Sequence, residues 1–209
     1  MTSLLLDRQQ VSEAMSLGKR LEKANWGYIL IAGPICSGKT TLSRMLENFF
    51  GERYISVTTI REEDYLRPLE DIPHDANGYL IDCLDAYFID EFKSDIKKYF
   101  KNRKAELPIY DLIAHERINS KQYVFMEDVT IIEGPHVISL FKKLEGAICI
   151  YMDTPLDVCL NRRVEKERRY YQIPEEKTVR FFNERVIPSY KKDILPQRNM
   201  YGVILYESN

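Results

Sequence analysis

Residues 33–41 have the sequence GPICSGKTT, which fits the phosphate-binding pattern G-x-x-x-x-G-K-[ST]. Two glycines let the backbone approach a chain of phosphates, and the loop amides together with a helix N-terminus favour anions. In this pattern Lys39 is expected to reach the β- and γ-phosphates of a nucleotide, and Thr40 to offer its hydroxyl to Mg²⁺. The residues predicted to bind the nucleotide are Gly33, Pro34, Ile35, Cys36, Ser37, Gly38, Lys39, Thr40 and Thr41.

Carboxylates follow two other segments that are typical of buried strands. The acidic residues 62–64 come just after the apolar stretch 54–60, and Glu133 closes the apolar stretch 129–133. Ligands of an open parallel sheet bind beyond the carboxyl ends of its strands, so these groups are placed to act as a base or to orient a metal-bound water. A solvated acidic turn and a plain strand end are the alternatives. Charge alone does not decide at 62–64, whereas at Glu133 we favour the Mg²⁺-linked water.

Apolar runs of strand length alternate along the chain with stretches of helical periodicity. The runs predicted to be strands are 28–32, 54–60, 129–134, 147–153 and 203–206. The stretches predicted to be helices are 3–25, 41–50, 86–99, 136–144, 155–171 and 175–190. Residues 69–83 are expected to form a loop, 103–106 a polar turn and 107–111 an extended segment. This alternation indicates an α/β fold with a doubly wound parallel sheet and helices on both faces.

The composition is that of an ordinary globular protein, with 44% hydrophobic and 30% charged residues among 209. We expect one domain over residues 1–209, in which 1–25 supply a leading helix. A net charge of −2 gives no basic field for nucleic acid, and no apolar run is long enough to span a membrane, so neither is an expected partner. The four cysteines lack metal-ligand spacing and no signal peptide is evident, which predicts reduced thiols and a cytoplasmic location. A homo-oligomer is left open.

Three classes of protein that carry this phosphate loop can be weighed. A GTPase would contain an Asn-Lys-x-Asp motif, which this sequence lacks. A motor or transport ATPase is usually larger and has a hydrophobic strand that ends in Asp. A small-molecule kinase needs a positioned acceptor hydroxyl, a carboxylate base and mobile arginines over the transferred phosphate. This chain has candidates for all of these parts.

The order and spacing of several motifs resemble the uridine kinase and phosphoribulokinase family of P-loop kinases. The matching segments are Gly33–Thr41, Leu84–Tyr87, Pro108–Asp111 with His115 and Arg117, Ile131–Gly134, Tyr151–Pro155 with Arg162 and Arg163, and Tyr201–Ile204. The resemblance extends from about Tyr28 to Tyr206. It implies a P-loop NTPase fold with a small helical lid, at about residues 162–180, and the use of ATP and Mg²⁺.

The resemblance also implies roles for individual residues. Asp85, Tyr110 and His115 would bind a nucleoside, and Arg162 would join them as a substrate-binding residue. Lid arginines would stabilise charge on the transferred phosphoryl group, which points to Arg163 by direct match and to Arg168 by position alone. Residues 166–171 lack the glycine of the family's R-D-x-x-x-R-G-R lid pattern.

The catalytic base is left between two residues. The family pattern Q-D-x-F-Y-[RK] aligns best with residues 62–67, which puts Glu63 where the family has Asp. A shift of one position would make Asp64 the base instead. The side chain of Glu is one methylene longer than that of Asp, which matters for a group that must lie within hydrogen-bond reach of the acceptor hydroxyl.

The resemblance therefore implies an ATP-dependent phosphotransferase that acts on the 5′-hydroxyl of a nucleoside such as uridine or cytidine. Kinases of nicotinamide riboside, pantothenate or ribulose phosphate share much of this scaffold and are alternatives. The Glu at the expected Asp position keeps a further alternative open, a nucleotide-binding regulator without catalysis, since function must be argued from the site and not from the fold.

Overall fold

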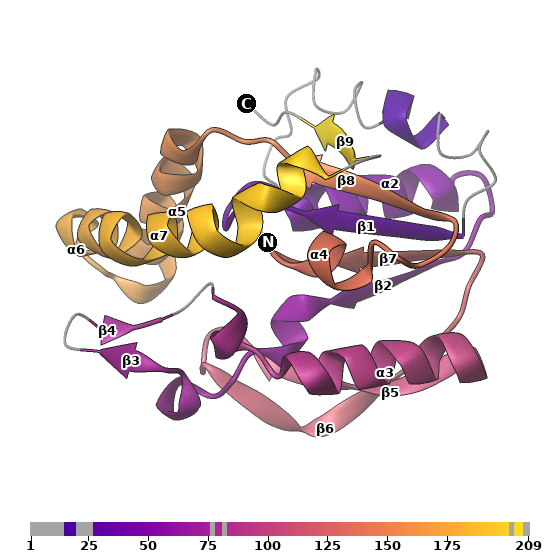
Figure 1. Ribbon diagram of the computed structural model, residues 1–209, viewed down its shortest axis with the longest axis horizontal. Coiled ribbons are helices and arrows are strands. Elements are labelled where there is room, and N and C mark those ends of the chain that lie inside the picture. The colour runs from indigo at the N-terminus through magenta and orange to yellow at the C-terminus, as the bar shows by residue number, and fades with distance from the viewer. Residues whose placement is uncertain (1–14, 20–26, 76–77, 81–82, 201–202, 207–209) are drawn as a thin grey trace.

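A five-stranded parallel sheet organises the computed structural model, which describes residues 15–19, 27–75, 78–80, 83–200 and 203–206. Its strand order is β2-β7-β1-β8-β9, and each neighbouring pair is parallel (Figure 1). The strands are β1 (Tyr28–Ala32), β2 (Val57–Arg61), β7 (Val129–Glu133), β8 (Ala147–Met152) and β9 (Val203–Tyr206). The five predicted strands and the doubly wound parallel sheet are therefore confirmed, although the second strand begins at Val57 and not at residue 54.

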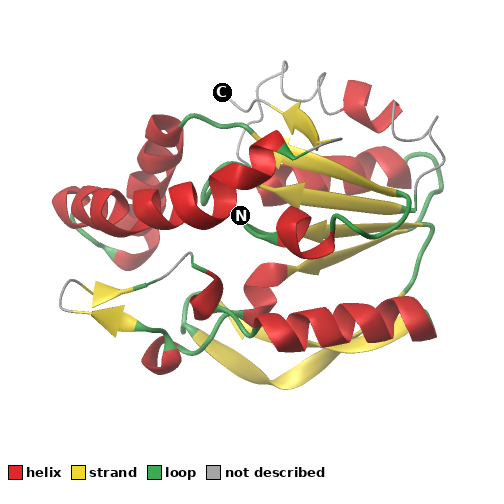
Figure 2. Cartoon of the chain, in the orientation of Figure 1, coloured by secondary structure: helices red, strands yellow, loops and turns green. Residues whose placement is uncertain are grey.

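The parallel register brings the carboxyl ends of the central strands to one edge of the sheet. Glu133, the last residue of β7, lies opposite Ile31 of β1 and Arg61 of β2. The arrowheads of these strands point toward the side of the molecule that carries α5 (Leu156–Tyr171) and α6 (Glu175–Phe181) (Figure 2). Side chains that follow these strands therefore share the edge where an open parallel sheet binds its ligands.

The residues of β1 alternate between two hydrophobic cores, because successive side chains of a strand point to opposite faces. Ile29 and Ile31 pack in the core that contains the buried face of α2 (Lys39–Gly51). Leu30 and Ala32 pack in the core that contains α3 (Ile89–Asn102) and α4 (Val137–Phe141). Helices thus cover both faces of the sheet, as predicted.

The helical segment after α5 is longer than the predicted helix 175–190. It runs through α6, the π-helical turn η4 (Phe182–Val186), α7 (Ile187–Ser189), the π-helical turn η5 (Tyr190–Ile194) and the 3₁₀ turn η6 (Leu195–Asn199). Pro188 and Pro196 each remove a backbone donor from this run, and its hydrogen-bonding pattern changes around them.

An antiparallel hairpin lies outside the central sheet, beside α3 (Figure 1). It pairs β5 (Lys104–Asp111) with β6 (Glu116–Phe125). The prediction of a polar turn at 103–106 was wrong, since β5 already begins at Lys104, whereas the extended segment 107–111 is confirmed. A second, shorter hairpin, β3 (His74–Asp75) with β4 (Gly78–Tyr79), lies within the predicted loop 69–83.

Two sequence predictions fall partly outside the described residues. Of the predicted leading helix, residues 15–19 are helical and Leu17 is buried in the α2 core, whereas 1–14 and 20–26 lie outside the description. Residues 201–202, which resemble the family's closing motif, also lie outside it. Among the described residues, no helix has the length and apolar character that crossing a membrane requires.

The sheet core predicts a large loss of stability when Leu30 is truncated. Leu30 has no exposed surface, so Leu30→Ala should lower the free energy of unfolding by about 2–5 kcal/mol through lost burial and a residual cavity. Urea denaturation measures this change. Leu112 is 36% exposed, and Leu112→Ala is the matched control, expected to stay within about 0.5 kcal/mol of wild type. Equal losses in the two variants would contradict this packing.

Candidate active site

The phosphate loop lies between β1 and α2, as the motif requires. Gly33 has a φ of 148°, and a Cβ there would come within 2.7 Å of Met152 Cβ. Gly38 caps α2 in the left-handed conformation, with a φ of 99°. The amine of Lys39 donates to the carbonyl oxygens of Gly33 at 3.1 Å and Pro34 at 2.8 Å. The carbonyl groups at the start of the loop thus bind the amine of Lys39. Both glycines have backbone conformations or surroundings that a side chain would disrupt.

Glu133 joins the end of β7 to the first turn of α2. Its carboxylate is 3% exposed and accepts hydrogen bonds from Thr40 Oγ1 at 3.0 Å and Ser43 Oγ at 2.8 Å. Burial raises the pKa of Glu133, and the bond from Ser43 partly offsets that rise. The contact between Thr40 and Glu133 brings together the two residues that the sequence assigned to Mg²⁺.

The oxygen atoms at Thr40 and Glu133 fit Mg²⁺ rather than a softer metal. Mg²⁺ is usually held by one or two carboxylates with substrate phosphates and water, not by a cage made of protein alone. In the part of the chain that the structure describes, no group of three or more His, Cys, Asp or Glu residues is placed to hold a metal. A site completed by nucleotide phosphates is consistent with this arrangement.

The three acidic residues after β2 point in different directions from the 3₁₀ turn η1 (Glu62–Tyr65). Glu62 is fully buried and bonds to His136. Asp64 is 3% exposed and bonds to Arg61 and to the backbone N–H of Tyr110, each at 3.3 Å. Burial raises the pKa of Asp64, and the nearby Arg61 opposes that rise. Glu62 is therefore bonded to the turn after β7, and Asp64 is bonded to β5.

Glu63 is the member of the acidic trio that lies toward Glu133. Its side chain is half-buried. Burial is the main cause of the raised pKa of Glu133, and the negative charge of Glu63 adds to it, so the two carboxylates lie within electrostatic reach of each other. Of the two candidate bases, Asp64 is bonded to the backbone of β5, whereas Glu63 is the one whose charge acts on Glu133. The choice of the base stays a prediction.

The residues predicted to bind the acceptor lie around η1 and the β5–β6 hairpin. Tyr110 is 7% exposed, and its hydroxyl donates to Arg67 O at 3.1 Å. Arg67 Nε in turn donates to Asp85 O at 2.9 Å, while the side chain of Asp85 is exposed in the turn η3 (Leu84–Ala86). Arg67 therefore connects the segments of Tyr110 and Asp85.

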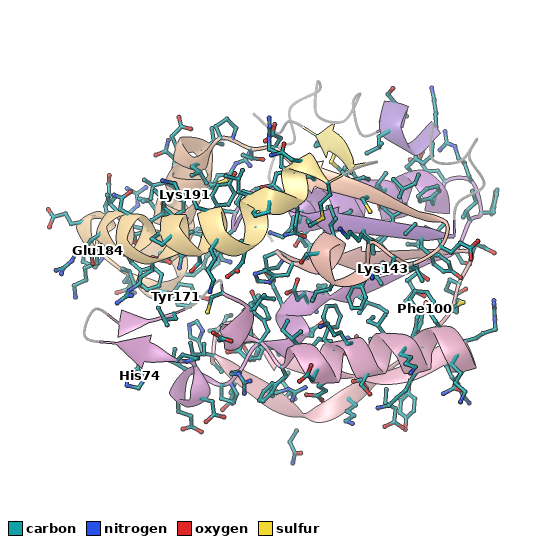
Figure 3. All side chains as sticks on the ribbon, viewed as in Figure 1. His74, Phe100, Lys143, Tyr171, Glu184 and Lys191 are labelled. Carbon is teal, nitrogen blue, oxygen red and sulfur yellow. The ribbon has the colours of Figure 1, made fainter. Side chains whose placement is uncertain are left out.

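His115 meets the end of helix α5 across the hairpin turn. Its ring stacks on Tyr171 with 5.7 Å between ring centres, and Tyr171 Oη donates to Leu112 O at 2.9 Å. Figure 3 labels Tyr171 where helices α5–α7 face the part of the chain that carries β3 and β4. The end of α5, which lies in the predicted lid, thus touches the turn of the β5–β6 hairpin. The sequence did not predict this contact, because the hairpin turn and the end of α5 are far apart along the chain.

The candidate lid arginines occupy three different environments. Arg162 is half-buried and donates to Cys36 O in the phosphate loop at 3.3 Å. Arg163 is 7% exposed; its Nε donates to Glu167 Oε1 at 2.6 Å, and its guanidinium lies over the ring of Phe181. Arg168 is exposed on α5.

Glu167 links α5 to α6. Its Oε1 accepts the bond from Arg163, and its Oε2 accepts one from Thr178 Oγ1 at 2.6 Å. This linkage accounts for the burial of Arg163 within the lid. Arg162 contacts the phosphate loop directly. The catalytic roles predicted for Arg163 and Arg168 stay predictions.

Two residues of the site were missed at the level of sequence. Ser43 follows Thr40 by three positions, so helical periodicity alone places both hydroxyls on the face that meets Glu133. Thr154 donates to Ser37 O at 2.8 Å and supports the phosphate loop from the end of β8. Its partner is distant in sequence, and no local pattern indicates the contact.

Comparisons with known proteins agree with these features. The sequence profile of the family described as "Phosphoribulokinase / Uridine kinase family" matches residues 28–207. A uridine kinase from Borreliella burgdorferi (strain ZS7) is 30% identical over 139 residues, which are 66% of this chain and 65% of that protein. A uridine kinase from Proteus mirabilis (strain HI4320) is 29% identical over 185 residues, 84% of each chain.

Among solved structures, a D-glycerate 3-kinase from Cryptococcus neoformans superposes with a TM-score of 0.61 at 15% identity, covering 97% of this chain and 94% of that one. At this identity the likeness concerns the fold alone. Proteins of this architecture therefore include one whose name specifies an acceptor other than a nucleoside.

The raised pKa of Glu133 predicts how Mg²⁺·ATP binding depends on pH. Only the ionised carboxylate can accept both hydroxyl bonds and attract the cation, so affinity should fall as pH falls through that raised pKa. Ser43→Ala removes a bond that lowers the pKa and should move the acidic limb to higher pH, whereas Ser43→Thr keeps a hydroxyl there. Titration calorimetry across the acidic pH range measures the acidic limb of Mg²⁺·ATP affinity in wild type and in each variant. An acidic limb that stays in place or moves to lower pH in Ser43→Ala would contradict the assignment.

Proposed function

Because the chain belongs to the phosphoribulokinase and uridine kinase family, we propose that it transfers the γ-phosphate of ATP to the 5′-hydroxyl of a nucleoside, uridine or cytidine. The observation that carries the proposal is that Glu133, bonded to Thr40 of the phosphate loop, lies at the same sheet edge as the acidic turn after β2, because Arg61 pairs with Glu133. The curated relatives named uridine kinase support the nucleoside as the acceptor class.

The phosphate loop and Lys39 act on the donor nucleotide. The loop amides and the N-terminus of α2 bind the phosphate chain of ATP. Lys39 exchanges its bonds to the Gly33 and Pro34 carbonyls for bonds to the β- and γ-phosphate oxygens. Thr40 and, through water, Glu133 would hold Mg²⁺, which supplies charge neutralisation and orientation of those phosphates. Catalysis in this class comes mainly from positioning and electrostatic stabilisation.

Glu63 serves as the base for the acceptor hydroxyl. The hydroxyl oxygen attacks the γ-phosphorus, the bond between that phosphorus and the ADP oxygen breaks, and the hydroxyl proton passes to Glu63. Asp64 is held by Arg61 and the Tyr110 N–H, so we assign it to shaping the acceptor side and assign the proton transfer to Glu63.

The acceptor occupies the side of the site formed by η1, η3 and the β5–β6 hairpin. Tyr110 and His115 contact the base and sugar, and Asp85 holds the sugar hydroxyls. Arg162, which already contacts the phosphate loop, is placed to act on the transferred phosphate. The lid closes before transfer, because a closed site excludes water as a competing acceptor.

The acceptor is tested by ADP formation from Mg²⁺·ATP with a panel of uridine, cytidine, adenosine, nicotinamide riboside, pantothenate, D-glycerate and ribulose 5-phosphate. Turnover with uridine or cytidine is the expected result. Turnover with another member alone would keep the assignment as a kinase and would replace uridine and cytidine as the acceptor. No turnover across the panel, with ATP bound normally, would favour a nucleotide-binding regulator over a kinase of these acceptors.

The base is tested by two isosteric variants. Glu63→Gln should lower kcat by about 10²- to 10⁴-fold, the usual contribution of a general base, while ATP affinity stays near that of wild type. Asp64→Asn should lose much less, because Asp64 only braces the acceptor side. Initial rates and nucleotide titrations on the same preparations separate the two effects. A large loss in Asp64→Asn with near-normal turnover in Glu63→Gln would transfer the role to Asp64.

A further inference from the structure

A fully buried carboxylate–imidazole pair joins the turn after β2 to the turn after β7. Glu62 Oε1 lies 2.7 Å from His136 Nδ1, and Glu62 Oε2 accepts the backbone N–H of His136 at 2.8 Å. Both side chains have 0% exposure. A buried carboxylate is costly unless its oxygens are paired, so this contact fixes the two turns firmly to each other.

The packing around Glu62 leaves little freedom for either turn. A Cβ at position 134 would collide with the Cβ and Oε2 of Glu62, so glycine is needed there. Beyond His136, Ser139 Oγ donates to His136 O at 2.7 Å, and Gln197 Nε2 donates to Pro135 O at 2.7 Å. The pair is therefore anchored to helix α4 and to the C-terminal helical run.

The two residues flank the reacting groups in sequence. Glu62 immediately precedes Glu63, and His136 follows Glu133 by three positions. Asp64, on the other side of Glu63, bonds to the backbone of Tyr110 in β5. Both sequence neighbours of Glu63 are thus buried and bonded to other segments. Glu62 bonds to the turn after β7, and Asp64 bonds to the β5–β6 hairpin.

We propose that the Glu62–His136 pair is a positioning device that sets Glu63 against Glu133 and the phosphate loop. This inference rests on the proposed kinase function. Loss of the Nδ1 bond frees the turn that carries Glu63 and leaves the phosphate loop intact. Turnover should then fall while ATP binding is preserved, since misplacing a reacting group by even an ångström slows the chemical step.

The geometry at His136 offers a matched pair of variants. His136 Nε2 has no hydrogen-bond partner among the described residues, so the contact with Glu62 is made by Nδ1 alone. Asn carries its amide nitrogen near the position of Nδ1, whereas Gln carries it near the position of Nε2. His136→Asn keeps the donor to Glu62 and removes the unpartnered atom, and His136→Gln loses that donor.

Steady-state kinetics on the full chain, with the best acceptor of the panel, give the first readout. His136→Gln should lower kcat by about tenfold or more with little change in KM for ATP, and His136→Asn should stay within about threefold of wild type. Glu62→Gln, whose amide can still bond to Nδ1 and to the His136 N–H, should resemble His136→Asn.

Amide hydrogen exchange of the folded proteins gives a second readout that does not need turnover. Peptides covering 60–66 and 132–138 should exchange faster in His136→Gln than in His136→Asn, with residues 28–45 unchanged. If His136→Gln matches wild type in both kcat and exchange, the proposal is overturned. Equal losses in His136→Asn and His136→Gln would also overturn it, because the Nδ1 bond would then not be what matters.

Failure of the proposed function would look different. A wild-type protein that turns over no acceptor fails as a kinase whatever the variants do. Exchange alone then decides whether the pair links the two turns, and unchanged exchange in His136→Gln would overturn that linkage as well.

Discussion

The site depends on one buried carboxylate at the end of a central strand. Glu133 has 3% exposure, and an ionised group in such a place must be paired to be tolerated. Its partners, Thr40 and Ser43, come from the first turn of α2, so this contact fixes the helix that follows the phosphate loop to β7. Since β7 lies between β1 and β2, the same residue sets where the loop and the acidic turn meet.

The acidic turn after β2 follows the same logic with three neighbouring carboxylates. A 3₁₀ turn directs successive side chains about a third of a turn apart, so the three cannot share one environment. Glu62 is buried and bonded to the turn between β7 and α4, and Asp64 is buried and bonded to β5. Glu63 is half-buried, and its charge acts on Glu133. Pairing two of the acids with structural partners leaves the third as the residue that we propose for proton transfer.

Local patterns predicted the central sheet and the phosphate loop, because apolar runs and helical spacing are properties of short segments. They failed at β5, whose first residues alternate between exposed and more buried positions, as in a strand. The charged residues Lys104 and Glu106 led to the prediction of a polar turn there. They also could not choose between Glu63 and Asp64. The surroundings of the two residues are set by His136 and Tyr110, which contact the turn from segments distant in the sequence.

The bond between Thr40 and Glu133 predicts that Thr40 and, through water, Glu133 hold the cation that accompanies ATP. The most direct test is the affinity for ATP with Mg²⁺ and with chelator, measured by titration calorimetry on wild type and Glu133→Gln. Mg²⁺ should strengthen ATP binding to wild type, and most of that gain should vanish in Glu133→Gln while Mg²⁺-free binding, which relies on Lys39 and the loop, persists. An equal gain from Mg²⁺ in both proteins would contradict the claim.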